Sequence, residues 1–240
     1  MSPIIVGHRG VSGTHPENTR ASIQKAIDLG LSWIEVDIQP TKDDVLVVCH
    51  DHNLERCSDG KGRLDEHTLA ELKQLDFGSW FSPDFAGEQI LTLSELLELA
   101  EHSNIQVNLE IKIDTHNPAH VVDLLAKELN STTLPSSQLL LSSFSHDVIE
   151  ELAQHCSQFR IGLITESLTS QDKSALIKNK AFSCHLNYQN LTQEQLDYLT
   201  NLGFQVWCYT VNQSESFPLI EKVDAIFTDF PTRFIGSASS

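Results

Sequence analysis

The chain has 240 residues, of which 40% are hydrophobic, as in an ordinary soluble globular protein. Its 33 acidic and 16 basic residues give a formal net charge of −17. Such an acidic surface repels nucleic acid and anionic membranes, so the charge argues against both as partners. An anionic substrate would therefore need local cations or a bound metal.

The sequence gives no sign of secretion or of a membrane anchor. Met1 is followed closely by the strand-like run 4–6 rather than by a signal peptide, and no apolar run reaches the ~20 residues that a membrane span needs. The cysteines are odd in number and lack CxxC spacing: Cys49, Cys57, Cys156, Cys184 and Cys208. This argues against a disulfide framework and a zinc site. We expect a cytoplasmic protein with reduced thiols and no stable membrane association.

The first part of the chain predicts one strand and one helix. Ile4–His8 has the character of a short buried strand. The following helix is expected to have Asn18 as its N-cap and Gly30 as its stop, with apolar residues at helical spacing between them.

The next two apolar runs predict a hairpin that carries charged side chains. Glu35 and Asp37 are two residues apart, so in a strand both carboxylates face the same side. Only four residues separate the runs, which is too few for a parallel crossover. If Pro40 lies opposite Val45, then Glu35 lies opposite His50. Two carboxylates and an imidazole would then share one face.

Residues 52–90 are too many, and too structured, for a simple connection. They contain a helical pattern near Thr68–Leu75 and an aromatic cluster at 77–81. We expect an insertion within the single domain 1–240. It is either a lid or binding element, or a unit whose aromatic residues form its own small core.

From residue 92 onward strands and helices alternate, and Thr92 opens the first helix with a capping box. The expected strands are Gln106–Ile113, Leu139–Leu141, Arg160–Ile164, Phe182–Leu186, Gln205–Tyr209 and Ala225–Phe227. Helices are expected to begin near Pro118, Ser145, Ser170, Thr192 and Ser214. With the second hairpin strand set aside, eight parallel strands remain, which predicts an α/β fold of the TIM (β/α)8 barrel type.

Charged residues gather at the C-terminal ends of the predicted strands, where such barrels have their active sites. These residues are His8, Arg9, Glu35, Asp37, His50, Glu110 and Lys112. Solvation at separate strand ends would explain each residue alone, but not their common location at one rim. The pattern therefore favours a functional site.

The residue types indicate a chemistry. The three carboxylates Glu35, Asp37 and Glu110 suit a hard divalent cation such as Mg²⁺ or Ca²⁺. His8 and His50 can serve as general base and general acid near neutral pH. The other nine histidines lack a motif context, and most of them are expected at the surface: His15, His52, His67, His102, His116, His120, His146, His155 and His185.

Two cations complete this set. Arg9 and Lys112 can neutralise a phosphate, and the guanidinium fork of Arg9 suits two phosphate oxygens. A metal, two histidines and two cations are the parts needed to cleave a phosphodiester.

The sequence resembles the glycerophosphodiester phosphodiesterase family, and most of all its cytoplasmic bacterial branch. The matching segments run in family order over nearly the whole chain: His8-Arg9-Gly10, Pro16-Glu17-Asn18-Thr19, Ile34-Glu35-Val36-Asp37, Thr41-Lys42-Asp43, His50-Asp51 with Leu54 and Arg56, Leu109-Glu110-Ile111-Lys112, Ser142-Ser143-Phe144, Tyr209-Thr210-Val211-Asn212 and Phe227-Thr228-Asp229. The branch is indicated by His185-Leu186-Asn187 and by the Tyr-Thr-Val-Asn form.

The resemblance implies a phospholipase C-like phosphodiesterase barrel with a small insertion after the hairpin. It implies that the three carboxylates bind the metal, that the two histidines are the acid–base pair, and that the two cations contact phosphate. The implied reaction releases sn-glycerol 3-phosphate and an alcohol such as choline, ethanolamine or glycerol. The attacking oxygen belongs either to water or to the glycerol 2-hydroxyl. Many members have Trp at the position of Tyr209, while Trp207 lies two residues earlier, so either ring is a candidate for stacking on the glycerol.

Two other functions are compatible with these residues. A lysophospholipase D would need an apolar groove beside the metal or a membrane-seeking face on the insertion, and Phe77, Trp80, Phe81 and Phe85 supply aromatic side chains there. A catalytically silent barrel that binds a phosphorylated ligand would be indicated by loss of a metal ligand or a histidine. All five of these residues are present.

Overall fold

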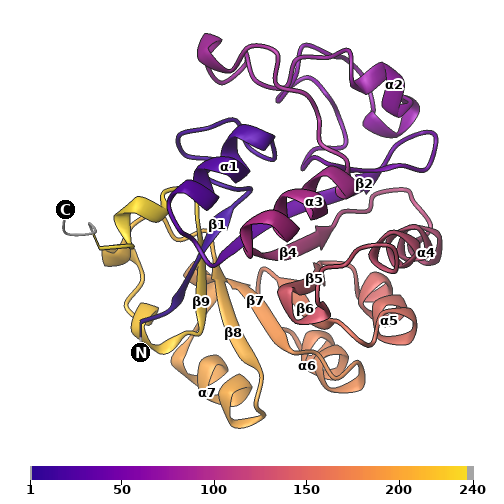
Figure 1. The fold of residues 1–240 in the computed structure, drawn as a ribbon. Coiled ribbons are helices and arrows are strands. Elements are labelled where there is room, and N and C mark those ends of the chain that lie inside the picture. The colour runs from indigo at the N-terminus through magenta and orange to yellow at the C-terminus, as the bar shows by residue number, and fades with distance from the viewer. Residues whose placement is uncertain (1, 237–240) are drawn as a thin grey trace.

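The computed structural model describes residues 2–236, and its parallel strands close into a barrel (Figure 1). The strand order is β1-β9-β8-β7-β6-β5-β4-β2, and β1 pairs with β2 to complete the ring. The strands are β1 (Ile4–His8), β2 (Trp33–Pro40), β4 (Gln106–Ile111), β5 (Leu139–Ser143), β6 (Arg160–Thr165), β7 (Ser183–Asn187), β8 (Gln205–Tyr209) and β9 (Ala225–Thr228), with β3 (Leu46–Val48) antiparallel to β2. The predicted TIM barrel is confirmed.

Helices cover the outside of the barrel (Figure 1). They are α1 (Arg20–Asp28), α3 (Leu93–Ser103), α4 (Pro118–Leu129), α5 (His146–His155), α6 (Ser170–Lys178) and α7 (Gln193–Asn201), and α2 (Leu69–Leu72) lies in the insertion. The predicted helix from Ser214 is wrong, because two short 3₁₀ turns, Ser214–Ser216 and Ile220–Lys222, connect β8 to β9. Pro218 separates these turns, since proline cannot donate a helical hydrogen bond and disfavours helical backbone before it.

The start of α1 also differs from the prediction. Thr19, and not Asn18, is the N-cap, and its side chain accepts a hydrogen bond from the backbone N–H of Ser22. Asn18 has a positive φ of 59° and uses its side-chain amide to bond Asp37 instead. Asparagine tolerates this left-handed conformation better than most residues, so the residue serves the site rather than the helix.

The hairpin is present, but its predicted register is wrong by one residue. Pro40 lies opposite Leu46 rather than Val45. The N–H of Thr41 donates to the carbonyl of Val45 at 2.9 Å, so the turn contains three residues and ends at Asp44 with a φ of 61°. A three-residue turn that ends in the left-handed region is a common hairpin connection.

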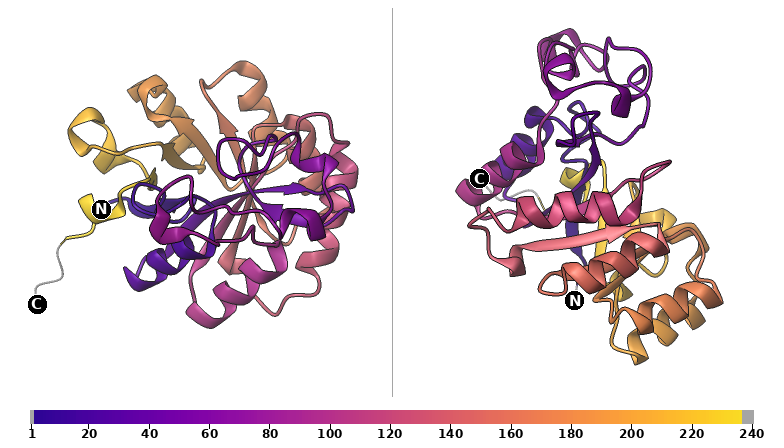
Figure 2. Two further views of the ribbon diagram at one scale, coloured as in Figure 1. Left: turned by 90° about the horizontal axis from the view of Figure 1, so that it is seen from above. Right: turned by 90° about the vertical axis from the view of Figure 1, so that its right-hand side faces the viewer.

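The insertion stands at one end of the barrel, apart from the covering helices (Figures 1 and 2). Its Leu54, Leu64, Leu72, Phe77 and Ile90 form a small separate core together with Val47 of β3 and the nearby Cys49. Trp80 and Phe81 pack edge to face at 5.6 Å between ring centroids outside this core, and Trp80 is partly exposed. The cavity at the C-terminal ends of the barrel strands, described below, has no residue of 52–90 in its lining.

Apolar side chains fill the barrel interior beneath its C-terminal end. They are Val6, Trp33, Leu140, Trp207, Ala225 and Phe227. All five cysteines are buried free thiols. In the described part of the chain, no helix combines the length and apolar character required to cross a membrane.

Candidate active site

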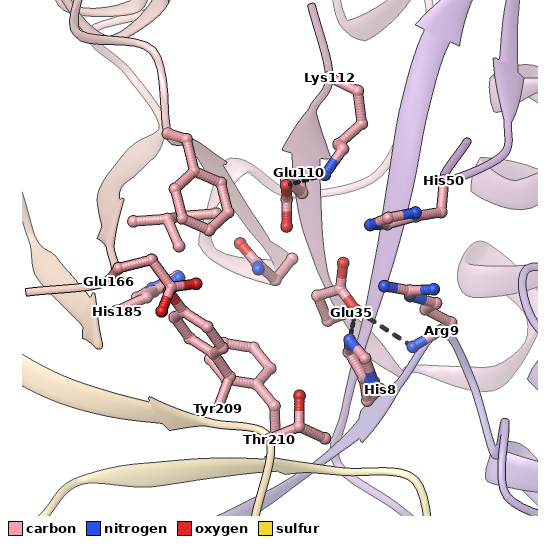
Figure 3. Close-up of a pocket in the computed structure, with 14 residues that line it drawn as sticks. His8, Arg9, Glu35, His50, Glu110, Lys112, Glu166, His185, Tyr209 and Thr210 are labelled. Atoms are coloured by element: carbon pink, nitrogen blue, oxygen red, sulfur yellow. Dashed lines mark hydrogen bonds and ion pairs between the residues drawn. The ribbon is translucent and has the colours of Figure 1, made fainter. Parts of the chain in front are cut away.

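A cavity of about 260 Å³ lies at the C-terminal ends of the barrel strands (Figure 3). It is lined by His8, Arg9, Glu35, His50, Asn108, Glu110, Lys112, Phe144, Ile164, Glu166, His185, Tyr209, Thr210 and Phe227. Every predicted site residue lines this cavity except Asp37 and Trp207. Asp37 lies directly behind its wall, only 1% exposed.

The three carboxylates form one cluster. Asp37 of β2 is the register partner of Glu110 on β4, and Glu35 lies two residues before Asp37 on the same face. One oxygen from each side chain lies within 4.8 Å of the other two. Oε1 of Glu35 is buried and has no hydrogen-bond partner among residues 2–236. A cluster of carboxylate oxygens with one buried oxygen unpartnered fits a hard divalent cation.

The pKa values of the three carboxyl groups in the cluster are shifted in different directions. Burial and the charges of Asp37 and Glu110 raise the pKa of Glu35 well above its ordinary value. Burial and the charge of Asp37 also raise the pKa of Glu110. Burial acts in the same direction on Asp37, but the charges of Arg9, His50 and Lys112 hold its pKa below the ordinary value. Asp37 therefore loses its proton more readily than Glu35 and Glu110, and a bound divalent cation would favour the ionised form of all three.

Arg9 and Lys112 both lie at the cluster, with Arg9 Nε 3.3 Å and Lys112 Nζ 3.8 Å from Asp37 carboxylate oxygens. The backbone N–H of Arg9 donates to Glu35 Oε2 at 3.1 Å, and its guanidinium donates to Glu17 Oε1 at 2.6 Å. Lys112 Nζ donates to Glu110 Oε1 at 2.8 Å. An arginine side chain has five N–H donors and an ammonium group has three, so both cations keep donors for an anionic ligand.

His8 is held by a carboxylate behind it. Its Nδ1 donates to Asp229 Oδ1 at 2.6 Å, and its Nε2 lies 3.9 Å from Glu35 Oε2 (Figure 3). Asp229 in turn accepts hydrogen bonds from Ser12 Oγ at 2.8 Å and Asn212 Nδ2 at 2.7 Å. The imidazole is thus fixed with Nε2 toward the cavity.

His50 is held in the same way by the next residue in the chain. Its Nδ1 donates to Asp51 Oδ1 at 2.6 Å, and burial lowers the pKa of His50. Arg56 of the insertion donates to Asp51 through Nε at 2.6 Å and to Glu17 at 2.8 Å. Since Glu17 also binds Arg9, the insertion braces both His50 and Arg9 without lining the cavity.

The structure separates the two candidate aromatic residues. Tyr209 lines the cavity, and its hydroxyl donates to the carbonyl of Thr165 at 3.0 Å. Trp207 is 1% exposed, and its Nε1 donates to Gln205 Oε1 at 2.9 Å. Trp207 therefore belongs to the barrel core below the cavity, and only Tyr209 is placed to touch a ligand.

The sequence patterns predicted no role for three residues that line the cavity, His185, Asn108 and Glu166, or for Asp229, which holds His8. His185 is one of the nine histidines without a motif context, and it is an exception to the expectation that most of them lie at the surface, because it is 1% exposed within β7. Asn108 is two residues before Glu110, so the alternation of a strand indicates that both face inward. Asp229 directly follows a strand end, which is where barrel site residues occur. Glu166 follows β6 and lines the cavity beside Tyr209.

Comparisons with known proteins agree with this geometry. Residues 8–233 match the Glycerophosphoryl diester phosphodiesterase family. A glycerophosphodiester phosphodiesterase of Caldanaerobacter subterraneus is 33% identical over 237 residues, which cover 98% of this chain and 97% of the relative. A glycerophosphodiester phosphodiesterase of Bacillus subtilis is 32% identical, over 96% of this chain and 85% of the relative.

A solved structure has the same fold. An Oleispira antarctica phosphodiesterase, determined in complex with the product sn-glycerol-3-phosphate, superposes with a TM-score of 0.89. The two chains are 30% identical over 97% of this chain and 95% of the other.

Proposed function

The chain belongs to the glycerophosphoryl diester phosphodiesterase family and is therefore a phosphoric diester hydrolase, and on this premise we propose that it cleaves glycerophosphodiesters to sn-glycerol 3-phosphate and an alcohol by histidine acid–base catalysis. The observation that carries the proposal is the arrangement of the cavity. Two histidines, each held through Nδ1 by a carboxylate, share the cavity with an acidic cluster and with the side chains of Arg9 and Lys112.

The acidic cluster and the two cations bind the phosphodiester. Glu35, Asp37 and Glu110 would hold Mg²⁺ or Ca²⁺, which when bound polarises a phosphoryl oxygen and stabilises negative charge on it. Arg9 and Lys112 donate to the remaining phosphate oxygens and offset their charge. Glu17 pairs with the Arg9 side chain and Glu110 with that of Lys112, and these carboxylates keep both side chains in place before substrate arrives.

The two histidines move the protons. Because Nδ1 of His8 is engaged by Asp229 and Nδ1 of His50 by Asp51, each ring presents Nε2 to the reacting groups. One Nε2 takes the proton from the attacking oxygen and the other gives a proton to the alcohol that leaves. The attacking oxygen is that of water or that of the glycerol 2-hydroxyl, and the same pair serves both routes.

Tyr209 contacts the glyceryl group. Its ring lines the cavity and is fixed by the hydrogen bond from its hydroxyl to Thr165. Phe144 meets it edge to face at 6.0 Å between ring centroids. A wall of this kind excludes water from one side of a small ligand.

Removal of either histidine tests this mechanism. We expect His8→Ala and His50→Ala to lose at least about 100-fold in kcat on glycerophosphocholine, since acid–base catalysis contributes about 10²–10⁴-fold. His120→Ala is the matched control, because His120 is half exposed and pairs with Asp44, away from the cavity lining. Turnover within threefold of the unmodified enzyme in either active-site variant would contradict the assignment.

A substrate that keeps one acyl chain is a second candidate. Phe144 is 44% exposed at the cavity and offers an apolar surface beside Lys112, 5.7 Å from its Nζ to the ring centroid. Faster cleavage of lysophosphatidylcholine than of glycerophosphocholine by the same preparation would favour a lysophospholipase D. The reverse order would exclude it as the main activity.

A further inference from the structure

The cavity has buried polar atoms that the acid–base chemistry does not use. Asn108 is 1% exposed, and neither its side-chain oxygen nor its nitrogen has a partner among residues 2–236. His185 is equally buried, and its Nδ1 is likewise unpartnered in that part of the chain. Both side chains line the cavity. Because buried polar groups in folded proteins are almost always hydrogen-bonded, three open positions in one cavity call for a ligand.

The position of Asn108 follows from the barrel register. Asn108 is the partner of Glu35 across β2 and β4, and it lies two residues before Glu110 on the same face. Its amide therefore lies level with Glu35 and one level below Asp37 and Glu110. A ligand whose phosphate is held at that cluster can reach Asn108 with the atoms next to the phosphate.

The ring of His185 is fixed in place. It stacks on Trp207 with 5.2 Å between centroids and 9° between planes, and its Nε2 shares a hydrogen bond with Ser183 Oγ at 2.9 Å. A Cβ at Gly162 would come within 2.7 Å of His185 Nε2, so glycine leaves room for the ring. With Nε2 engaged, Nδ1 is the atom of the ring that remains for a ligand. Figure 3 shows His185 across the cavity from Glu35 and beside Glu166.

Asn108 and His185 are suited to uncharged ligand groups that both donate and accept hydrogen bonds. Burial lowers the pKa of His185 to about 3, so the ring is neutral, with one donor and one acceptor nitrogen. The Asn108 amide offers two donors and an acceptor. Neither group supplies a charge for an ammonium or a second phosphate, whereas hydroxyl groups match both.

We propose that Asn108 and His185 recognise the two free hydroxyl groups of the glyceryl half of the substrate, and so are specificity-determining residues. The inference rests on the proposed function, because the glyceryl half is common to all its substrates while the alcohol varies. A site built to bond a hydroxyl strongly rejects an analogue without one, since its own polar atoms are then left unpaired. An ordered water bridging the two side chains is the competing explanation.

Binding of two matched ligands tests the proposal. sn-Glycerol 3-phosphate and propyl phosphate share a phosphate and a three-carbon chain, but only the first has hydroxyl groups. We expect titration calorimetry in Mg²⁺ to show at least about tenfold tighter binding of sn-glycerol 3-phosphate to the unmodified protein. In His185→Phe and Asn108→Leu this preference should fall to about threefold or less, with propyl phosphate binding little changed.

Phe227→Leu is the control, because Phe227 also lines the cavity and contacts the ring of His185 but has no polar side-chain atom. It should shift the binding of both ligands equally. Equal weakening of both ligands in the His185 and Asn108 variants, or an unchanged preference, would overturn the proposal.

Thermal unfolding of Asn108→Leu gives a second readout. Replacing an unpartnered buried amide with an apolar side chain of similar size should raise the melting temperature while the preference is lost. A lower melting temperature with an unchanged preference would identify a structural, water-bridged amide. If the unmodified protein binds sn-glycerol 3-phosphate selectively but does not hydrolyse glycerophosphocholine, the proposed reaction fails while the hydroxyl site stands.

Discussion

The hydrogen bond between Asp229 and His8 gives a prediction that depends directly on the geometry. Asp229→Asn keeps the size of the side chain but removes its charge and brings an NH₂ group toward either His8 Nδ1 or Asn212 Nδ2. The imidazole then loses the partner that fixes which nitrogen carries the proton and where Nε2 points. We therefore expect kcat to fall with little change in substrate binding.

The size of the effect follows from this contact. The bond is short, at 2.6 Å, and the His8 and Asp229 side chains are 20% and 26% exposed, so solvent screens it only in part. Hydrogen bonds to charged groups contribute about 1.5–3 kcal/mol. At about 1.36 kcal/mol per tenfold in rate, loss of the bond should lower kcat by roughly 10- to 150-fold.

Steady-state kinetics on glycerophosphocholine measures this loss. Ser12→Ala is the control, because it removes a different hydrogen bond to the same carboxylate, at 2.8 Å, and leaves His8 bound. It should lower kcat less than Asp229→Asn does, because Asp229 keeps its charge and its hydrogen bonds to His8 and Asn212. A kcat for Asp229→Asn as high as that of the control would refute the positioning role.

The Asp229 carboxylate should also make the thermal stability of the protein depend on pH. Although burial works the other way, the bonds from His8, Asn212 and Ser12 hold the pKa of Asp229 below its ordinary value. A lowered carboxyl pKa stabilises the fold above the unfolded-state pKa of about 3.9, and the contribution is lost as pH falls through the folded-state value. The difference in melting temperature between Asp229→Asn and the unmodified protein should therefore be present at pH 7 and narrow below about pH 4.

Three further outcomes follow from the site. Glu110→Gln should lower kcat at least about 100-fold and reduce the rise in melting temperature that Ca²⁺ or Mg²⁺ produces, because it removes one of three metal-binding carboxylates; an undiminished rise would contradict that role. The pKa values of Glu35 and Glu110 are raised, so protons compete with the metal for these carboxylates at higher pH than is usual for a carboxyl group. The rise in melting temperature that the metal produces should therefore become larger from about pH 5 to pH 8, and a rise that does not depend on pH would count against the cluster. Arg56→Met should lower kcat by about threefold to tenfold because it frees Asp51, and the effect stays small because Arg56 is 44% exposed. Arg63→Met, which breaks ion pairs with Asp65 and Asp114 instead, should leave kcat unchanged.

Local signals predicted most of the barrel. The capping boxes at Thr92 and Thr192 mark the starts of α3 and α7 as observed. The alternation of strands and helices was sufficient for the fold class, because a parallel strand needs a covered crossover. The convergence of charged residues followed from their positions at strand ends, which a closed parallel barrel brings to one rim.

Features that depend on long-range partners could not be predicted in this way. The hairpin register depends on the left-handed conformation of Asp44, which a sequence pattern does not specify. Asn18 has the residue type of an N-cap, but its side chain bonds Asp37, 19 positions away. His185 is inside the barrel because Gly162 and Trp207 leave a slot for its ring, and such a slot exists only after the strands have closed.

The most direct test of the proposed function is the release of sn-glycerol 3-phosphate from glycerophosphocholine by the unmodified protein, with EDTA and then with Mg²⁺ or Ca²⁺ added back. We expect release that EDTA abolishes and one of the two metals restores, because the three carboxylates form a site whose chemistry depends on a divalent cation. Full activity in EDTA would contradict the role of the carboxylate cluster. No release with either metal, across several head groups, would contradict the proposed reaction itself.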